Sequence, residues 1–177
     1  TSAWDSGVYD HEVVPVPGVD LARDEAIRAD STLETLAALK PAFRETGSVT
    51  AGNSSPLNDG AGALVIGAEG VLDSEPLARI VSRGVHAVDP DVFGIAPVEA
   101  ANKALARAGK TWADVDVVEL NEAFAAQSIA CIRELGLKDN DPRINPNGGA
   151  IAIGHPLGVT GARIAYSAAL ELQLTGK

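Results

Sequence analysis

Apolar residues along the chain fall into short continuous runs and into longer stripes with helical spacing. The runs ALVI at 63–66 and VDVVEL at 115–120 are typical of strands buried within a sheet. Polar residues dominate 20–29 and indicate an irregular segment. Further extended segments are predicted as strands at 12–16 and 77–88 and as a strand or turn at 47–52.

The first amphipathic stripe has signals for both of its ends. Ser31 and Glu34 have the Ser-x-x-Glu spacing of a capping box, which begins a helix. The apolar stripe continues to Leu39, and Pro41 stops it because the residue before a proline avoids helical backbone angles. We therefore predict a helix over about 32–39.

Three further helices are predicted in the second half. Pro97 fits the first turn of a helix that ends at Gly109. Asn121 is expected to cap the next helix, and Gly136 to end it. A last apolar stripe covers 162–172. Strands that alternate with helices favour an α/β architecture with parallel strands.

Composition limits the classes of partner. The chain has 177 residues, 46% of them hydrophobic, and a net charge of -10. This charge argues against nucleic acid or an anionic membrane as a partner. No apolar run reaches the length of a membrane span, and residues 1–10 lack a signal-peptide pattern. A single cysteine excludes an internal disulfide framework. We expect a cytoplasmic protein with one core.

The ends of the chain differ from those of a complete gene product. There is no methionine at all, and the last residues are Gly176 and Lys177, a helix-ending glycine followed by one lysine. A further strand would normally follow such a glycine. We expect the chain to be a piece of a longer subunit.

The segment NPNGGAIAIGHPLGVTG at 145–161 is the first candidate for a functional site. It contains five glycines, and its histidine, His155, lies between Gly154 and Pro156. Glycines let main-chain N–H groups approach a ligand, and imidazole titrates near neutral pH, as a general acid or base requires. The helix that follows would direct its positive end at an oxyanion. The alternative is an ordinary tight turn with a surface histidine.

A second polar cluster, NEAFA, begins at Asn121. It follows the predicted strand at 115–120 directly, so Asn121 lies where open α/β sheets bind ligands. The alternative role for Asn121 is a helix cap and nothing more.

Together these segments resemble the thiolase family. NEAFA at 121–125, NPNGGAIAIGHPLGVTGAR at 145–163 and TAGNSSPLNDGA at 50–61 resemble three of its signature blocks in the right order. The resemblance covers the whole chain and aligns it with the carboxyl-terminal half of a thiolase subunit. It implies a layered α/β/α thiolase-like fold, here incomplete. The implied enzyme cleaves or condenses 3-ketoacyl-CoA thioesters through a cysteine acyl-enzyme, with CoA and acyl-CoA as substrates and no metal or permanent cofactor.

The resemblance also implies roles for individual residues. His155 matches the histidine that takes the proton of the nucleophilic cysteine and then binds the thioester oxygen, and Asn121 matches the asparagine that holds a water in the same oxyanion hole. The positions that match coenzyme A contacts are Arg28, Thr35 and Leu39 at the nucleotide end and Phe43, Ser55 and Phe124 along the pantetheine arm. Without the resemblance, Arg28 would be interpreted as a solvated charge, Ser55 as a turn residue, and Phe43 and Phe124 as core aromatics.

The departures from the family concern its two cysteines. Neither the nucleophile nor the Cys-x-Gly acid/base has a match, and Cys131 lies about three helical turns from Asn121, as a buried inert thiol. The nucleophile is therefore expected outside this chain, which alone would be inactive without the amino-terminal half. The family implies a homodimer or homotetramer. We divide the chain into a remnant of the CoA-binding loop domain, the end of the amino-terminal domain and a truncated carboxyl-terminal domain, at 1–46, 47–70 and 71–177.

Two other functions remain possible from the sequence. One is a non-catalytic thiolase-like protein that binds acyl-CoA or transfers lipids, but such a carrier needs no base beside an oxyanion site. The other is a nucleotide-binding α/β domain, against which stands the lack of a phosphate loop. Acetoacetyl-CoA formation, fatty-acid β-oxidation and aromatic-ring degradation are all compatible with the family, and residues 127–137 and 145–147 favour the last.

Overall fold

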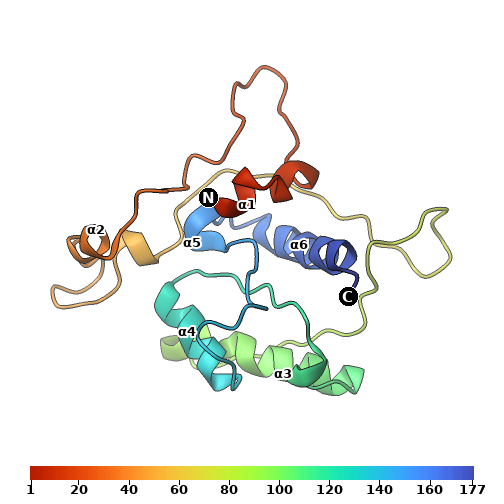
Figure 1. Cartoon of the computed structure of the whole chain (residues 1–177). Helices are drawn as coiled ribbons and strands as arrows, with labels where there is room; N and C mark the ends of the chain where they lie inside the picture. The colour runs from red at the N-terminus through yellow and green to blue at the C-terminus, as the bar shows by residue number, and fades with distance from the viewer.

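Helices and long extended segments make up the fold, and no two segments pair as a regular sheet (Figure 1). The computed structural model describes all 177 residues. Bridges between single residue pairs join Pro41 to Thr50, Ser54 to Phe124 and Val118 to Ile144. The elements in chain order are α1 (Ser2–Asp5), η1 (Val8–His11), α2 (Leu33–Ala37), η2 (Ala51–Asn53), η3 (Pro90–Ile95), α3 (Ala96–Ala108), η4 (Trp112–Asp114), α4 (Ala125–Glu134), α5 (Ala150–Ile153) and α6 (Thr160–Thr175).

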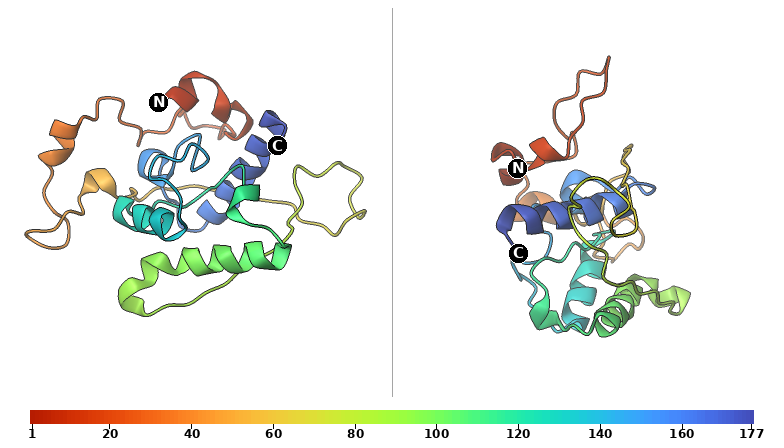
Figure 2. Two further views of the ribbon diagram at one scale, coloured as in Figure 1. Left: turned by 60° about the horizontal axis from the view of Figure 1, so that its bottom comes forward. Right: turned by 90° about the vertical axis from the view of Figure 1, so that its right-hand side faces the viewer.

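Two groups of helices lie on either side of the central loops (Figures 1 and 2). α3 and α4 pack against each other and against η3. α5 and α6 form the other group, and the amino-terminal turn with α1 and η1 lies over α6. Tyr166 and Ser167 of α6 hold this turn by donating hydrogen bonds to His11 O (3.1 Å) and Glu12 Oε2 (2.9 Å). None of the helices is long and apolar enough to cross a membrane.

The helix predicted from Pro97 to Gly109 is confirmed as α3. Pro97 lies in its first turn, and Gly109 ends it with a left-handed φ of 65°. The stripe predicted over 162–172 is likewise confirmed within α6, which ends at Gly176.

Two predicted helix starts are wrong. α4 begins at Ala125 and not at Asn121, because residues 121–124 are extended beside 54–55: Ser55 N donates to Ala123 O at 3.1 Å. α2 is capped by Thr32, whose side chain accepts from Thr35 N, and not by Ser31. The helix is also shorter than predicted and ends at Ala37.

The predicted strands are not formed as paired strands. The run at 63–66 was expected to be buried, but Val65 is 86% exposed and Ile66 is 70% exposed. The whole chain exposes 12332 Å², whereas a compact monomer of this size exposes about 8,000 Å². A strand buried on both faces needs neighbouring strands, and no strand pairs with residues 63–66.

Residues 82–88 keep the alternation of a strand even without a paired neighbour. Ser82, Gly84, His86 and Val88 are half-buried, and the residues between them are exposed. The half-buried side faces α3, where a Cβ on Gly84 would lie 1.8 Å from Ala100 O. Only glycine allows so close a contact between this segment and the helix.

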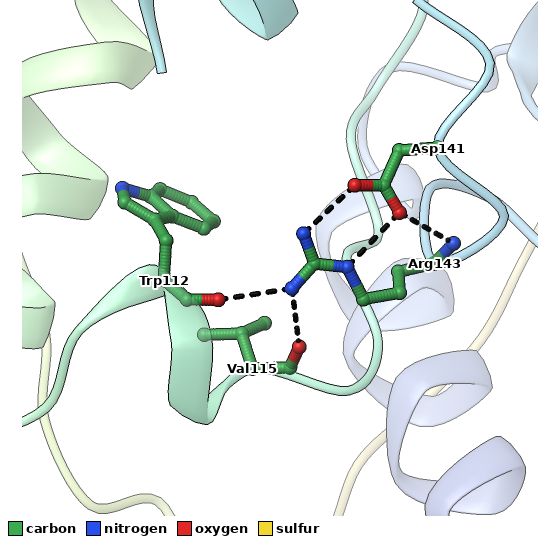
Figure 3. Close-up of polar contacts among 4 residues, drawn as sticks. All are labelled: Trp112, Val115, Asp141 and Arg143. Carbon is green, nitrogen blue, oxygen red and sulfur yellow. Dashed lines mark hydrogen bonds and ion pairs between the residues drawn. The ribbon is translucent and has the colours of Figure 1, made fainter. Parts of the chain in front are cut away.

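Arg143 joins the segment after η4 to the segment that leads into the glycine loop (Figure 3). Its guanidinium donates to both carboxylate oxygens of Asp141, at 2.9 and 2.7 Å. It also donates to the carbonyl oxygens of Trp112 (2.9 Å) and Val115 (2.8 Å). Backbone bonds of 2.8 Å then run from Val118 N to Arg143 O and from Asn145 N to Val118 O. Arg143 therefore fixes the start of the loop that carries His155.

We predict that Arg143→Ala weakens the contact between residues 112–118 and residues 141–145. Without the guanidinium, two backbone carbonyls and one carboxylate lose charge-assisted hydrogen bonds, so the amides of Val118 and Asn145 should exchange about tenfold faster or more with solvent deuterium. Arg133→Ala is the matched control, because Arg133 also binds a carboxylate with two hydrogen bonds (Asp139, 2.9 and 2.7 Å) but contacts no backbone carbonyl. Equal exchange rates in the two variants would contradict the role of Arg143.

The contact between residues 112–118 and residues 141–145 should also weaken in acid. Hydrogen bonds from Arg143 lower the pKa of Asp141 from 3.8 to about 2. A lowered carboxyl pKa stabilises the folded state above the unfolded pKa, and this contribution disappears as the pH falls through the folded pKa. Protection of the Val118 amide should therefore be constant above about pH 4 and decrease toward pH 2, and Asp141→Asn should remove this dependence.

Candidate functional site

His155 is held in place by the glycine loop on one side and by α6 on the other. It follows α5 through Gly154, whose φ is 107°, and it is half-buried. A Cβ at Gly154 would lie 2.4 Å from Asn58 Oδ1, so the turn before His155 requires glycine for both its backbone angle and its space. The imidazole Nδ1 lies 2.8 Å from Thr160 Oγ1 at the start of α6.

The second ring nitrogen of His155 meets Asn121. The distance from Asn121 Nδ2 to His155 Nε2 is 3.3 Å. The residues are 34 positions apart in sequence, so their approach results from the fold. The two side chains therefore approach each other as expected, but His155 is not among the residues that line the cavity beside Asn121. The Oδ1 atom of Asn121 is buried and has no hydrogen-bond partner within the chain.

Asn121 lines a cavity of about 800 Å³ together with Phe43 and Phe124. The two phenylalanine rings meet edge to face with their centroids 6.0 Å apart. Ser55 lies beside them, where its Oγ donates a hydrogen bond to Ala123 O at 3.2 Å. Asn121, Phe43, Ser55 and Phe124 thus belong to one region of the molecule.

The three residues expected at the nucleotide end of coenzyme A do not line this cavity. Arg28 is exposed and forms no salt bridge. Thr35 uses its hydroxyl to cap α2, accepting from Thr32 N at 2.9 Å and donating to Thr32 O at 3.0 Å. Leu39 packs over Gly52, where a Cβ would lie 2.6 Å from Leu39 Cδ1. All three are on the segment that carries α2 away from the helix groups (Figure 1).

Glu122 was not identified from the sequence, although it is part of the NEAFA block. Its Oε1 accepts from Asn145 Nδ2 at 2.9 Å, and its Oε2 accepts from Ile151 N at 3.2 Å. Asn145 also bonds both backbone groups of Leu120, at 2.8 and 2.9 Å. Glu122 and Asn145 therefore tie the segment of Asn121 to the loop of His155.

Thr160 was also missed. It is 3% exposed, and its hydroxyl lies between the His155 ring and the Pro156 carbonyl oxygen, to which it donates at 3.0 Å. The sequence contains a signal for it, a hydroxyl residue five positions after the histidine, at the start of the predicted helix. Asn58, beside Gly154, has no comparable signal in the sequence.

Two carboxyl groups near the site have raised pKa values. Burial raises the pKa of Glu119 to about 7, and the positive charge of Arg163 opposes this shift. Burial also raises the pKa of Glu12, and the hydrogen bond from Ser167 and the charge of Arg163 oppose this shift. Because Glu119 lines the same cavity as Asn121, a carboxyl that changes charge near neutral pH lies at the cavity wall.

Cys131 has no part in this geometry. It is 0% exposed, and its Sγ contacts Gly94 O at 3.2 Å and Gln127 Nε2 at 3.5 Å. A thiol enclosed in this way cannot reach a ligand, which agrees with the expected buried role. No group of three or more His, Cys, Asp or Glu side chains is arranged to hold a metal ion.

The arrangement combines a proton acceptor with an amide donor. An imidazole nitrogen can take a proton from a nucleophile, and an amide N–H beside it can stabilise a negative oxygen. The aromatic cavity next to them suits an apolar arm of a ligand. Acyl transfer to a nucleophile supplied from outside the chain fits these three features.

Comparison with known proteins agrees with the geometry. Residues 1–70 match the family profile "Thiolase, N-terminal domain" and residues 74–177 match "Thiolase, C-terminal domain". The 3-oxoadipyl-CoA/3-oxo-5,6-dehydrosuberyl-CoA thiolase of Escherichia coli K12 is 49% identical over 96% of this chain and 45% of its own length. A 3-ketoacyl-CoA thiolase of Aliivibrio fischeri is 47% identical, with 96% of this chain and 47% of that protein covered.

Solved structures match equally well. Human mitochondrial 3-ketoacyl-CoA thiolase is 44% identical, with a TM-score of 0.93 over 99% of this chain and 46% of that chain. The same enzyme in complex with CoA gives the same TM-score, with 45% of that chain covered. The chain therefore follows part of the layered α/β fold of these structures, with its own extended segments not paired as a sheet, and it spans less than half the length of the curated relatives it matches.

We predict that Gly149→Ala breaks the link between Glu122 and Asn145. A Cβ at this position would lie 2.1 Å from Glu122 Cδ, so the carboxylate must move, at a cost of about 1–3 kcal/mol. The side-chain amide resonances of Asn145 and the backbone amide of Ile151 should shift in a ¹H–¹⁵N spectrum. Gly158→Ala in the same loop is the control, since a Cβ there meets nothing within 4 Å. Unmoved resonances in Gly149→Ala would show that the carboxylate is not held there.

Proposed function

The chain belongs to the thiolase family, and on this premise we propose that it is the catalytic carboxyl-terminal part of an acyltransferase subunit that acts on 3-ketoacyl-CoA thioesters. The observation that carries the proposal is the 3.3 Å approach of Asn121 to His155 at the edge of an aromatic cavity. A protein that only carries acyl-CoA has no need of a base beside an amide donor. The geometry therefore favours the enzyme over the carrier.

His155 begins the reaction by taking a proton. A cysteine thiol, with an ordinary pKa of about 8.5, is mostly protonated at neutral pH and needs an adjacent base. His155 Nε2 accepts that proton from the nucleophilic cysteine, which lies outside this chain. The thiolate then attacks the 3-keto carbon of the substrate, and an oxyanion forms on the former carbonyl oxygen.

Asn121 and the protonated His155 stabilise the thioester oxygen, which becomes negative when the carbon–carbon bond breaks and the enolate forms. The imidazolium Nε2–H donates to the oxygen, and the Asn121 amide adds a second donor through a water that it holds. Cleavage of the carbon–carbon bond leaves an acyl-enzyme and releases the enolate of acetyl-CoA, which takes a proton from the acid/base cysteine outside this chain. The thiol of a second CoA gives its proton to the same acid/base cysteine and attacks the acyl-enzyme. The shortened acyl-CoA forms, and the nucleophilic cysteine leaves as a thiolate that takes back the proton held by His155.

Coenzyme A is the substrate that the remaining expected residues serve. Phe43 and Phe124 offer aromatic surface for the pantetheine arm, with Ser55 beside them. Arg28, Thr35 and Leu39 lie on the projecting α2 segment and would contact the nucleotide end, where the arginine can pair with a phosphate. The solved human relative is described in complex with CoA, which supports this assignment.

The rest of the subunit completes the site. We propose the division of the chain at 1–46, 47–70 and 71–177, with the nucleophile on the amino-terminal half of the same subunit. The subunit acts in the cytoplasm as a homodimer or homotetramer, without a permanent cofactor and without nucleic acid or membrane partners. The substrate class is 3-ketoacyl-CoA in general, because relatives named for different acyl groups match at 49% and 47% identity.

The test is mutation of the two converging residues in the intact subunit. His155→Ala and Asn121→Ala should each lower the turnover of CoA-dependent acetoacetyl-CoA cleavage by about a hundredfold or more, the usual effect of losing an acid/base or oxyanion group. The loss of the acetoacetyl-CoA enolate absorbance measures the rate.

His86→Ala is the matched control, because this histidine lies beside α3 and contacts Lys103 Nζ at 2.9 Å, away from the cavity. It should keep wild-type turnover. Wild-type turnover in both His155→Ala and Asn121→Ala would refute the proposed acyl transfer.

A further inference from the structure

We propose that Thr160 is a positioning residue that selects the tautomer of His155, so that the proton sits on Nδ1 and Nε2 keeps the lone pair that a base needs. The inference rests on the proposed function only for its effect on turnover. The selection of the tautomer can be measured in this chain without any reaction.

The Thr160 hydroxyl is buried beside the His155 ring. Thr160 is 3% exposed, so its hydroxyl has little access to water and must find its partners within the protein. Two groups are within reach: His155 Nδ1 at 2.8 Å and Pro156 O at 3.0 Å.

The hydrogens on the Thr160 hydroxyl and the His155 ring decide which atom donates in each hydrogen bond. A hydroxyl has one hydrogen to donate, and a carbonyl oxygen can only accept. When Thr160 donates to Pro156 O, its oxygen is left to accept from His155 Nδ1–H. A neutral imidazole carries one N–H, so Nε2 then holds a lone pair.

Asn121 provides an independent constraint on the same ring. Its Nδ2 atom, which can only donate, faces His155 Nε2 at 3.3 Å. If Thr160 donated to Nδ1 instead, Nε2 would carry the hydrogen, and two N–H groups would point at each other. The arrangement in which every donor meets an acceptor is the one with the proton on Nδ1.

The consequence concerns the nitrogen that faces the site. Because Nε2 is beside Asn121 and Nδ1 is turned toward α6, a proton can be taken from the nucleophile only at Nε2. An imidazole in water favours the opposite tautomer, with the proton on Nε2. Thr160 therefore keeps the ring ready to accept a proton, and a hydroxyl at this position is required for that purpose.

The experiment uses the ¹⁵N-labelled 177-residue chain at a pH where the imidazole is neutral. Long-range ¹H–¹⁵N correlation distinguishes the two ring nitrogens, and His11→Gln and His86→Gln identify the signals of His155. The wild type and Thr160→Ser should hold the proton on Nδ1. In Thr160→Val, which keeps the branched shape and loses the hydroxyl, the form with the proton on Nε2 should become the majority.

The spectrum of the wild type tests the inference by itself, so the test does not depend on whether Thr160→Val folds. A majority of Nε2–H in the wild type would mean that the Asn121 amide presents Oδ1 to the ring and that Thr160 donates to Nδ1. An unchanged tautomer in a folded Thr160→Val would show that the hydroxyl does not select it.

Turnover in the intact subunit supplies a second result. Thr160→Val should lower kcat for acetoacetyl-CoA cleavage by about 10- to 100-fold with little change in KM, and Thr160→Ser should stay within about threefold of wild type. If the tautomer behaves as expected but His155→Ala keeps full turnover, the proposed function fails and the role of Thr160 in holding the ring stands.

Discussion

The arrangement of this chain depends on polar side chains that satisfy backbone groups where a sheet would otherwise do so. Buried peptide groups must be hydrogen-bonded, and along 115–122 the partners come from Arg143, Asn145 and a few backbone bonds. Glu122 extends the same network to the start of α5. Asn121 and His155 meet at 3.3 Å because both are attached to this network.

The network also explains why two positions of the loop must be glycine. Gly149 leaves room for the Glu122 carboxylate, and Gly154 leaves room for Asn58 while adopting a φ of 107°. These glycines are needed for contact with particular neighbours, not for flexibility. Gly149 and Gly154 therefore position the loop that carries His155, which has Thr160 at its far end.

Much of this organisation could be predicted from the sequence. α3 and α6 follow from their apolar stripes and their terminal glycines, and the meeting of Asn121 with His155 was implied by the resemblance of their two blocks to the thiolase family. The start of α4 could not be predicted, because the contact with 54–55 that keeps 121–124 extended is a long-range one. The local preference of asparagine for a cap was overridden by that contact. Glu122 and Thr160 were missed because their partners are set by the fold.

The open segments at 63–66 and 82–88 have a further consequence for the chain on its own. Extended backbone that is not paired in a sheet and that carries exposed valine and isoleucine is a template for association with other chains. The net charge of -10 sets electrostatic repulsion against such association. Since salt screens that repulsion over about 10 Å at 0.1 M, ionic strength governs whether solutions of the isolated chain stay dispersed or form aggregates.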